Sequence, residues 1–259
     1  MSLDSAWLSF IFYSIVGWIY ESTVCSMITE GHFINRGFLL GPYCPVYGIG
    51  AVSCYFLLNR IENPLTLFLA AMFLCSVIEY MTSYGMEKLF HARWWDYSRF
   101  PFQLHGRICL YGALVFGFAN VLICFIVQPD FLNFLKMINP ACTYVFVILS
   151  AFVFMADTIT TLIAWTNLNQ RLDTLHKELF EKSNNSMEEL SNYLLQKTPY
   201  RISHGKWGIQ ICMNNLNVKL KKSELRFLHA FPNVKLLRYE KMLKTIRIKE
   251  FIKNVFDKL

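Results

Sequence analysis

Five long apolar stretches constrain this sequence more than any other feature. They cover residues 6–28, 38–58, 65–89, 107–127 and 141–167. An α-helix needs about 20 apolar residues to cross the hydrocarbon core of a bilayer, and each stretch reaches that length. Soluble domains carry about 25% charged residues, whereas this chain has 17% charged and 54% hydrophobic residues. We therefore predict an all-α, polytopic protein of the lipid bilayer with about five transmembrane helices.

The positive charge of the chain is concentrated behind these stretches. Residues 1–167 hold seven Lys or Arg and nine Asp or Glu, whereas residues 168–259 hold eighteen and nine. Because Lys and Arg accumulate on the cytoplasmic side of a membrane, we predict a transmembrane helical domain, 1–167, and a basic, helical cytoplasmic tail, 168–259. With five spans and a cytoplasmic tail, the chain is predicted to be a multi-pass protein of the cell membrane whose N-terminus lies on the outer side.

The tail has a helical rather than a nucleic-acid-binding pattern. Its basic residues alternate with Leu, Ile and Phe at helical periods, which suits a folded tail or a membrane surface. No nucleic-acid partner is therefore expected. An apolar stripe continues the fifth span up to Ser183, and Ser186 with Glu189 forms a capping box that opens another helix. Further helices are predicted over 200–230 and 239–259.

The second stretch cannot form one regular helix from its beginning. Pro42 and Pro45 stand beside Gly41 and Gly48, and each proline lacks a backbone donor and crowds the preceding turn. The stretch is either a broken or re-entrant segment or a simple kinked helix. Irregular backbone at membrane depth needs protein or a water-filled cavity to cover it, so the first reading makes the segment a candidate wall of a site.

The fourth stretch is expected to run as a helix from Arg107 to about Val127. Ala113 and Gly117 give it a face of small residues for close helix packing. Residues 128–130, with a central proline, are expected to end the helix. A short amphipathic piece, 131–138, then leads to the fifth span.

Three carboxylates lie inside apolar stretches, namely Glu21, Glu79 and Asp157. A charge near the middle of a bilayer costs about 3 kcal/mol or more, so these side chains must face other helices or water. Arg36 and Arg107 stand at the mouths of the second and fourth stretches. We expect a polar centre in which Glu79 or Glu21 pairs with one of these arginines. It is either a binding site or proton path, or a structural cluster of ion pairs that fixes helix register.

A second group of candidates follows the third stretch. Ser76, Glu79, Tyr80, Ser83 and Glu87 share one helix face, and an aromatic and basic connector, 90–106, comes next. Its tryptophans suit an interfacial belt, but their density also suits headgroup or substrate contacts. The complete set of predicted substrate-binding residues is Glu21, Arg36, Glu79, Glu87, His91, Trp94, Trp95, Asp96, Tyr97, Arg107 and Asp157.

Metal and nucleotide sites are not indicated. His32, His91 and His105 match no established ligand spacing, and the eight cysteines form no CxxC pair, so no metal and no cofactor are expected. The sequence has no GxxxxGK[ST] loop for ATP phosphates and no GxSxG or HExxH motif. Energy from ATP would have to come from another chain.

Several ordered motifs carry a family resemblance. They are Gly17-Trp18-Ile19-Tyr20-Glu21, Asn35-Arg36-Gly37-Phe38, the proline-rich run from Gly41 to Gly48, Glu79-Tyr80, the run from Phe90 to Ser98, and Gly106-Arg107-Ile108-Cys109. Over about residues 8–165 the chain resembles the bacterial putative ABC-transporter type IV family, the CmpB-like permeases. The resemblance implies a transport component and a separate ATPase subunit as partner, and the tail lies outside it.

Three functions remain open from the sequence. The first is a transport component with a buried polar site, either alone or as a homo-oligomer. The second is an enzyme of the membrane interface, in which Glu79 or Glu87 with His91 or His105 performs acid–base chemistry on a lipid-linked substrate. The third is a non-catalytic membrane sensor or scaffold that works through its tail.

Overall fold

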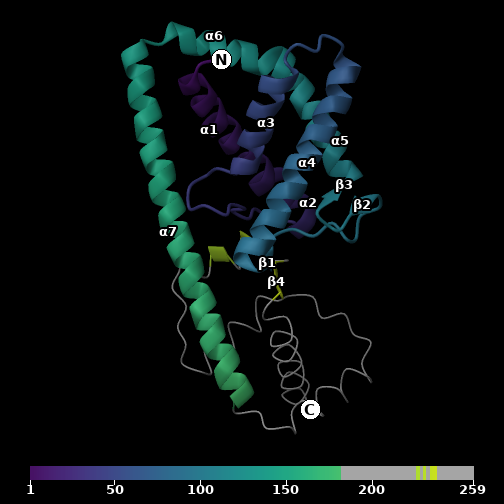
Figure 1. Ribbon diagram of the computed structural model, residues 1–259, viewed down its shortest axis with the longest axis vertical. Coiled ribbons are helices and arrows are strands. Elements are labelled where there is room, and N and C mark those ends of the chain that lie inside the picture. Colours follow the sequence, from purple (N-terminus) through teal and green to yellow (C-terminus); the bar gives the residue numbers. More distant parts are fainter. Residues whose placement is uncertain (182–225, 228–229, 232–233, 238–259) are drawn as a thin grey trace. The chain divides into compact units, whose positions relative to one another are not determined.

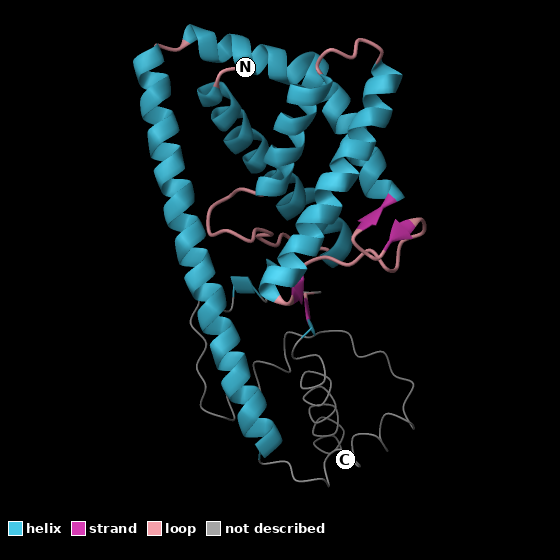
Figure 2. Cartoon of the chain, viewed as in Figure 1, coloured by secondary structure: helices cyan, strands magenta, loops and turns pink. Residues whose placement is uncertain are grey.

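The computed structural model describes residues 1–181, 226–227, 230–231 and 234–237 (Figure 1). The chain forms two compact units, Met1–Phe90 with Trp95–Thr161 and His91–Trp94 with Leu162–Leu259. Helices dominate the described residues, and strands are few and short (Figure 2). The predicted all-α membrane class is confirmed, because four helices are long and apolar enough to cross a bilayer: Leu3–Thr29, Pro64–Phe90, Leu110–Met137 and Pro140–Thr174.

The first span contains a change of helix type. Helix α1 (Leu3–Tyr20) continues through a π-helical turn, η1 (Glu21–Cys25), into α2 (Ser26–Glu30). The Ser26 hydroxyl donates to the Glu21 carbonyl oxygen, 2.9 Å away, and the Ser26 N–H reaches the same carbonyl. A π-turn inserts an extra residue and locally turns the helix face, and here it begins at the carboxylate Glu21.

The second apolar stretch begins as irregular chain, as the first of the two readings predicts. Residues 31–44 contain no helix, and α3 (Pro45–Leu58) starts with Pro45 in its first turn, where the missing N–H of proline has no cost. The irregular chain is covered by protein, since the Cys44 N–H donates to the carbonyl oxygen of Ser14 in the middle of α1 (2.8 Å). Helix α3 has 14 residues and is shorter than the other four apolar helices.

The core of the first unit lies between α3, α4 and α5. Helix α4 (Pro64–Phe90) buries the predicted polar face, with Glu79 and Ser83 turned inward. Cys54, Ala71 and Cys75 form a buried cluster in this core. The small face predicted for the fourth span is also buried: a side chain at Gly117 would lie 3.0 Å from Phe68 of α4.

The fourth span departs from the predicted helix at both ends. Residues 107–109 do not begin it: β2 (Gln103–Leu104) and β3 (Ile108–Cys109) pair antiparallel, and α5 (Leu110–Leu122) starts after them. The hairpin is possible because His105 and Gly106 adopt positive φ between the two strands.

The proline in 128–130 does not end the helix either. A π-turn, η2 (Ile123–Val127), joins α5 to α6 (Gln128–Met137). The Gln128 N–H reaches back to the Ile123 carbonyl, and Pro129 falls in the first turn of α6, where a missing N–H is tolerated. Figure 1 shows α6 running across the end of the bundle toward α7.

Helix α7 (Pro140–Glu181) contains the fifth span and continues beyond it, as the apolar stripe predicts. In the second unit Leu168 and Leu172 are fully buried, and Trp165 packs on Trp94 with ring centroids 4.7 Å apart. Phe227 lies against both tryptophans. Strands β1 (Ala92–Arg93) and β4 (Lys235–Leu236) pair antiparallel in this unit. The tail helices predicted beyond Ser183 fall almost wholly outside the described residues.

Candidate functional site

Glu21 and Arg36 meet where the π-turn faces the irregular segment. One carboxylate oxygen of Glu21 accepts a hydrogen bond from the Tyr47 hydroxyl of α3, 2.6 Å away. The other lies 3.8 Å from the Arg36 guanidinium, and the two side chains are 27% and 17% exposed. Arg36 also donates to Thr29. The structure thus brings together two of the predicted residues, from separate elements, in an ion pair that is neither tight nor fully closed.

Backbone contacts hold Arg36 in place. Its N–H donates to the Ser22 hydroxyl (3.1 Å), and its carbonyl accepts from the Cys44 thiol (3.4 Å). Ser22 belongs to η1, so the π-turn that starts with Glu21 also fixes the segment that carries Arg36. The neighbouring Asn35 accepts a hydrogen bond from the Trp18 indole (2.8 Å).

Close helix packing places the Tyr47 ring. A side chain at Gly17 of α1 would lie 2.3 Å from the Tyr47 Cγ, so only glycine leaves room for the ring. At the residue after Tyr47, a side chain at Gly48 would lie 2.4 Å from the Phe10 carbonyl oxygen of α1. The approach of α1 to α3 therefore depends on these two glycines and aims the Tyr47 hydroxyl at Glu21.

Glu79 forms a second carboxylate position. It is 6% exposed, and its Oε1 accepts a hydrogen bond from Tyr97 of the connector (3.1 Å). Burial raises the pKa of the Tyr97 hydroxyl well above its usual value, and the charges of Glu79 and Glu21 contribute to the rise. Tyr97 therefore lies within electrostatic range of both carboxylates, which come from α4 and η1.

Arg107 does not pair with either of these carboxylates. Its Nη2 lies 3.1 Å from Glu87, one turn from the end of α4, and its guanidinium lies over the rings of Tyr80 and Tyr84 at 5.5 and 5.2 Å. Arg107 is 7% exposed, and its Nε and Nη1 have no hydrogen-bond partner among the described residues. Cation–π contacts of this kind are worth up to about 2 kcal/mol when desolvated.

The predicted connector residues fall into different environments. In the first unit, the Trp95 indole donates to the Arg107 carbonyl (3.0 Å), and Asp96 accepts from the N–H and the hydroxyl of Ser98. In the second unit, Trp94 is buried in the aromatic core, and the exposed His91 accepts the Leu237 N–H through its carbonyl. For these four residues a substrate contact stays a prediction.

His105, in the hairpin turn, is one of the residues of the enzyme hypothesis. His105 is exposed, has φ of 53°, and its Nδ1 lies 3.1 Å from the Tyr80 hydroxyl. Glu87, the proposed partner in acid–base chemistry, is engaged with Arg107. The enzyme hypothesis therefore stays a prediction.

Asp157 binds the irregular segment. Its Oδ1 accepts from the Leu40 N–H (2.8 Å) and the Thr161 hydroxyl (2.9 Å). Its Oδ2 accepts from the Gly41 N–H (2.7 Å) and the Tyr43 hydroxyl. The carboxylate of α7 thus satisfies two backbone donors of non-helical chain at membrane depth, where an unsatisfied donor costs several kcal/mol.

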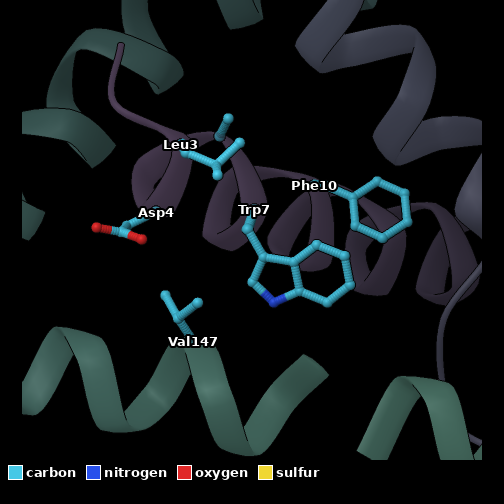
Figure 3. A pocket seen from close by; sticks show the side chains of 6 residues that line it. Leu3, Asp4, Trp7, Phe10 and Val147 are labelled. Atoms are coloured by element: carbon cyan, nitrogen blue, oxygen red, sulfur yellow. The ribbon is translucent and has the colours of Figure 1, made fainter. Parts of the chain in front are cut away.

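The polar face of α7 also contacts α1. The Trp7 indole donates to the Ser150 hydroxyl (2.9 Å) beside a recess of about 420 Å³. Figure 3 shows Trp7 and Phe10 of α1 and Val147 of α7 around the recess, with Asp4 at its edge. Apart from Asp4 its lining is apolar, which suits hydrocarbon better than a polar solute.

The sequence patterns did not single out Tyr47, Ser22 or the ring of Tyr84 beneath Arg107. Tyr47 lies in the proline-rich run from Gly41 to Gly48, but no spacing rule predicts that a residue of the second stretch contacts Glu21 in the first. The tyrosines Tyr80 and Tyr84 do carry a signal, because they lie three to seven residues before Glu87 on the same helix, next to its partner arginine.

The four helices that are long and apolar enough to cross a bilayer define the chain as a polytopic membrane protein, and charged side chains lie among them. The comparisons agree with this class. The family model described as putative ABC-transporter type IV matches residues 8–162, which is more than half of the chain, so the protein belongs to this family. No curated protein and no solved structure matches the sequence.

Proposed function

We propose that the chain is the membrane-embedded permease component of a transporter, with its substrate site around Glu21 and Arg36. The observation that carries the proposal is the incomplete ion pair at the π-turn. A strong charge-assisted hydrogen bond measures about 2.7–2.9 Å, whereas this pair is separated by 3.8 Å and remains partly exposed. Glu21 can therefore exchange Arg36 for a cationic group of a substrate without first breaking a close contact between the two side chains.

Three further groups extend this site in the proposal. Glu79 with Tyr97 forms its inner end, and Arg107 with Glu87 forms a second charged pair in the same unit. Asp157 belongs to the site indirectly, because it accepts hydrogen bonds from the backbone of the irregular segment, 31–44. This segment carries Arg36 and leads into α3, which carries Tyr47. The site faces the cytoplasm in the predicted topology, and the basic tail meets an ATPase subunit there. Assembly as a homo-oligomer is a further prediction.

Two experiments test the proposal. The tagged protein is purified from its native membrane in a mild detergent, and an ATPase is expected at a fixed ratio by mass spectrometry. Cells lacking the protein are then complemented with the wild type, with Glu21→Gln, and with Glu62→Gln as a control at the exposed turn before α4. Untargeted metabolite profiles should be restored by the wild type and the control but not by Glu21→Gln. Equal restoration by all three removes Glu21 from the mechanism.

A further inference from the structure

Glu79 differs from the two other glutamates of this region in its charge balance. Glu21 faces the guanidinium of Arg36, and Glu87 faces that of Arg107. Among the described residues, no basic side chain forms an ion pair with Glu79. It is nevertheless the most buried of the three, with 6% exposure.

The hydrogen bonding of Glu79 fits a neutral acid. Its Oε1 accepts from the Tyr97 hydroxyl (3.1 Å), and its Oε2 has no hydrogen-bond partner among the described residues. Because the raised pKa of Tyr97 keeps its phenol protonated, Tyr97 remains a neutral donor and supplies no charge. One neutral hydrogen bond offsets only a small part of the free energy that an uncompensated buried carboxylate costs.

The neighbouring groups do not offset a negative charge either. The titratable groups that face Glu79 in the described residues are the Glu21 carboxylate from η1, the Tyr97 hydroxyl, and the thiols of Cys75 in α4 and Cys109 in β3. None is cationic, and the nearest acid adds repulsion. Among the described residues, no group of three His, Cys, Asp or Glu is arranged for a metal ion.

We propose that Glu79 is a proton-binding site, which carries a proton on Oε2 in the resting protein while Oε1 accepts from Tyr97. The proton neutralises the carboxyl without a cavity or a cationic side chain. The site goes beyond the proposed function, because it exists whether or not the chain moves a substrate. In a permease it would couple a protonation step to the neighbouring Glu21–Arg36 pair.

Infrared spectroscopy of the full-length protein in detergent micelles tests the site. A protonated carboxyl gives a carbonyl stretching band that an ionised carboxylate lacks. At neutral pH the wild type should show this band, and Glu79→Gln should lack it. Glu87→Gln, which changes a glutamate bound to Arg107, is the matched control and should keep it. The band should weaken as the pH is raised toward alkaline values.

Stability gives a second reading. Gln has the shape and neutrality of the protonated acid, so Glu79→Gln should fold, and its midpoint of thermal unfolding should equal that of the wild type below about pH 4, where the unfolded glutamate is protonated too. Above that pH the unfolded wild type is ionised and must take up a proton to fold, so the wild type should lose stability relative to Glu79→Gln as the pH rises. The absence of a band specific to Glu79, or failure of Glu79→Gln to fold, overturns the proposal. Loss of metabolite restoration in Glu21→Gln does not depend on this band, so the two proposals fail separately.

Discussion

Replacing Asp157 by asparagine should release the irregular segment that precedes α3. Asparagine exchanges one carboxylate oxygen for an NH₂ group. If that group replaces Oδ1, it faces the N–H of Leu40; if it replaces Oδ2, it faces the N–H of Gly41. The hydroxyls of Thr161 and Tyr43 can rotate and accept from the amide, but a backbone N–H cannot. In either orientation one partly buried peptide donor loses its acceptor.

The expected cost follows from this count. One unsatisfied buried donor costs about 1–3 kcal/mol, and the remaining hydrogen bonds lose the roughly twofold strength that a charged acceptor gives them. We expect a total of about 3 kcal/mol. For a chain of this size about 1 kcal/mol shifts the unfolding midpoint by roughly 2–4 °C, so Asp157→Asn should unfold about 6–12 °C lower.

Two variants calibrate the result. Asp130→Asn makes the same chemical change at an exposed position in the first turn of α6, where the helix dipole is worth about 0.3–1 kcal/mol. Thr161→Val removes one hydroxyl from Asp157 and keeps both backbone donors paired, so its cost should be about 1 kcal/mol. The order of destabilisation should be Asp157→Asn, then Thr161→Val and Asp130→Asn.

Cysteine labelling localises the effect. Cys44 lies at the end of the irregular segment, and its thiol donates to the Arg36 carbonyl. N-ethylmaleimide labelling of Cys44, followed by peptide mass spectrometry, should rise in Asp157→Asn and stay at the wild-type level in Asp130→Asn. Equal midpoints and equal labelling in these two variants would refute the account of how the segment is held.

Three other predictions concern packing, pH and topology. Gly17→Ala should displace the Tyr47 ring and destabilise the protein by about 1–3 kcal/mol, whereas Gly85→Ala, which meets nothing within 4 Å, should be neutral or stabilising in thermal unfolding. Burial raises the pKa of Tyr97, so its hydroxyl binds the proton more tightly in the folded state than in the unfolded state. The stability of the protein should therefore fall as the pH rises above about 10. Tyr97→Phe should remove part of that fall, and a pH profile identical to that of the wild type would contradict the prediction. Cys142, exposed near the start of α7, should react with a membrane-impermeant maleimide on intact cells in the predicted topology; labelling only after lysis would invert it.

Regular periodicity made the helices predictable. The polar face of α4 follows from residues three, four and seven apart, and the structure buries Glu79 and Ser83 as that spacing requires. Pro42 and Pro45 excluded a regular helix at the start of the second stretch and left an irregular segment as one of two readings, which the structure confirms. In both cases the cause is local, because neighbouring residues alone decide the backbone conformation.

Contacts between distant segments were not predictable in the same way. The sequence placed Arg107 at the mouth of the fourth stretch and predicted a pair with Glu79 or Glu21, but the structure places Arg107 before β3, outside α5, and beside Glu87. The Gln128–Pro129 pair would stop an ordinary helix, but a π-turn accommodates it. The sequence favoured an interfacial position for Trp94, because tryptophans are common at the membrane interface. Only the pairing of β1 with β4 and the contact with Trp165 show that Trp94 belongs to the core of the second unit.

The number of hydrogen-bond donors around each acidic side chain distinguishes the roles of Glu79 and Asp157 better than their positions along the apolar helices do. By depth, Glu79 and Asp157 are equivalent carboxylates in the middle of apolar helices. Asp157 accepts from four donors, two on each oxygen, and two of the four are backbone N–H groups that cannot turn away. A proton on either oxygen would face one of these N–H groups, so the fold requires the ionised form. Glu79 has one neutral donor among the described residues. A carboxyl that the fold does not need in its charged form is free to change its protonation, and this difference makes Glu79 the functional candidate and Asp157 the anchor.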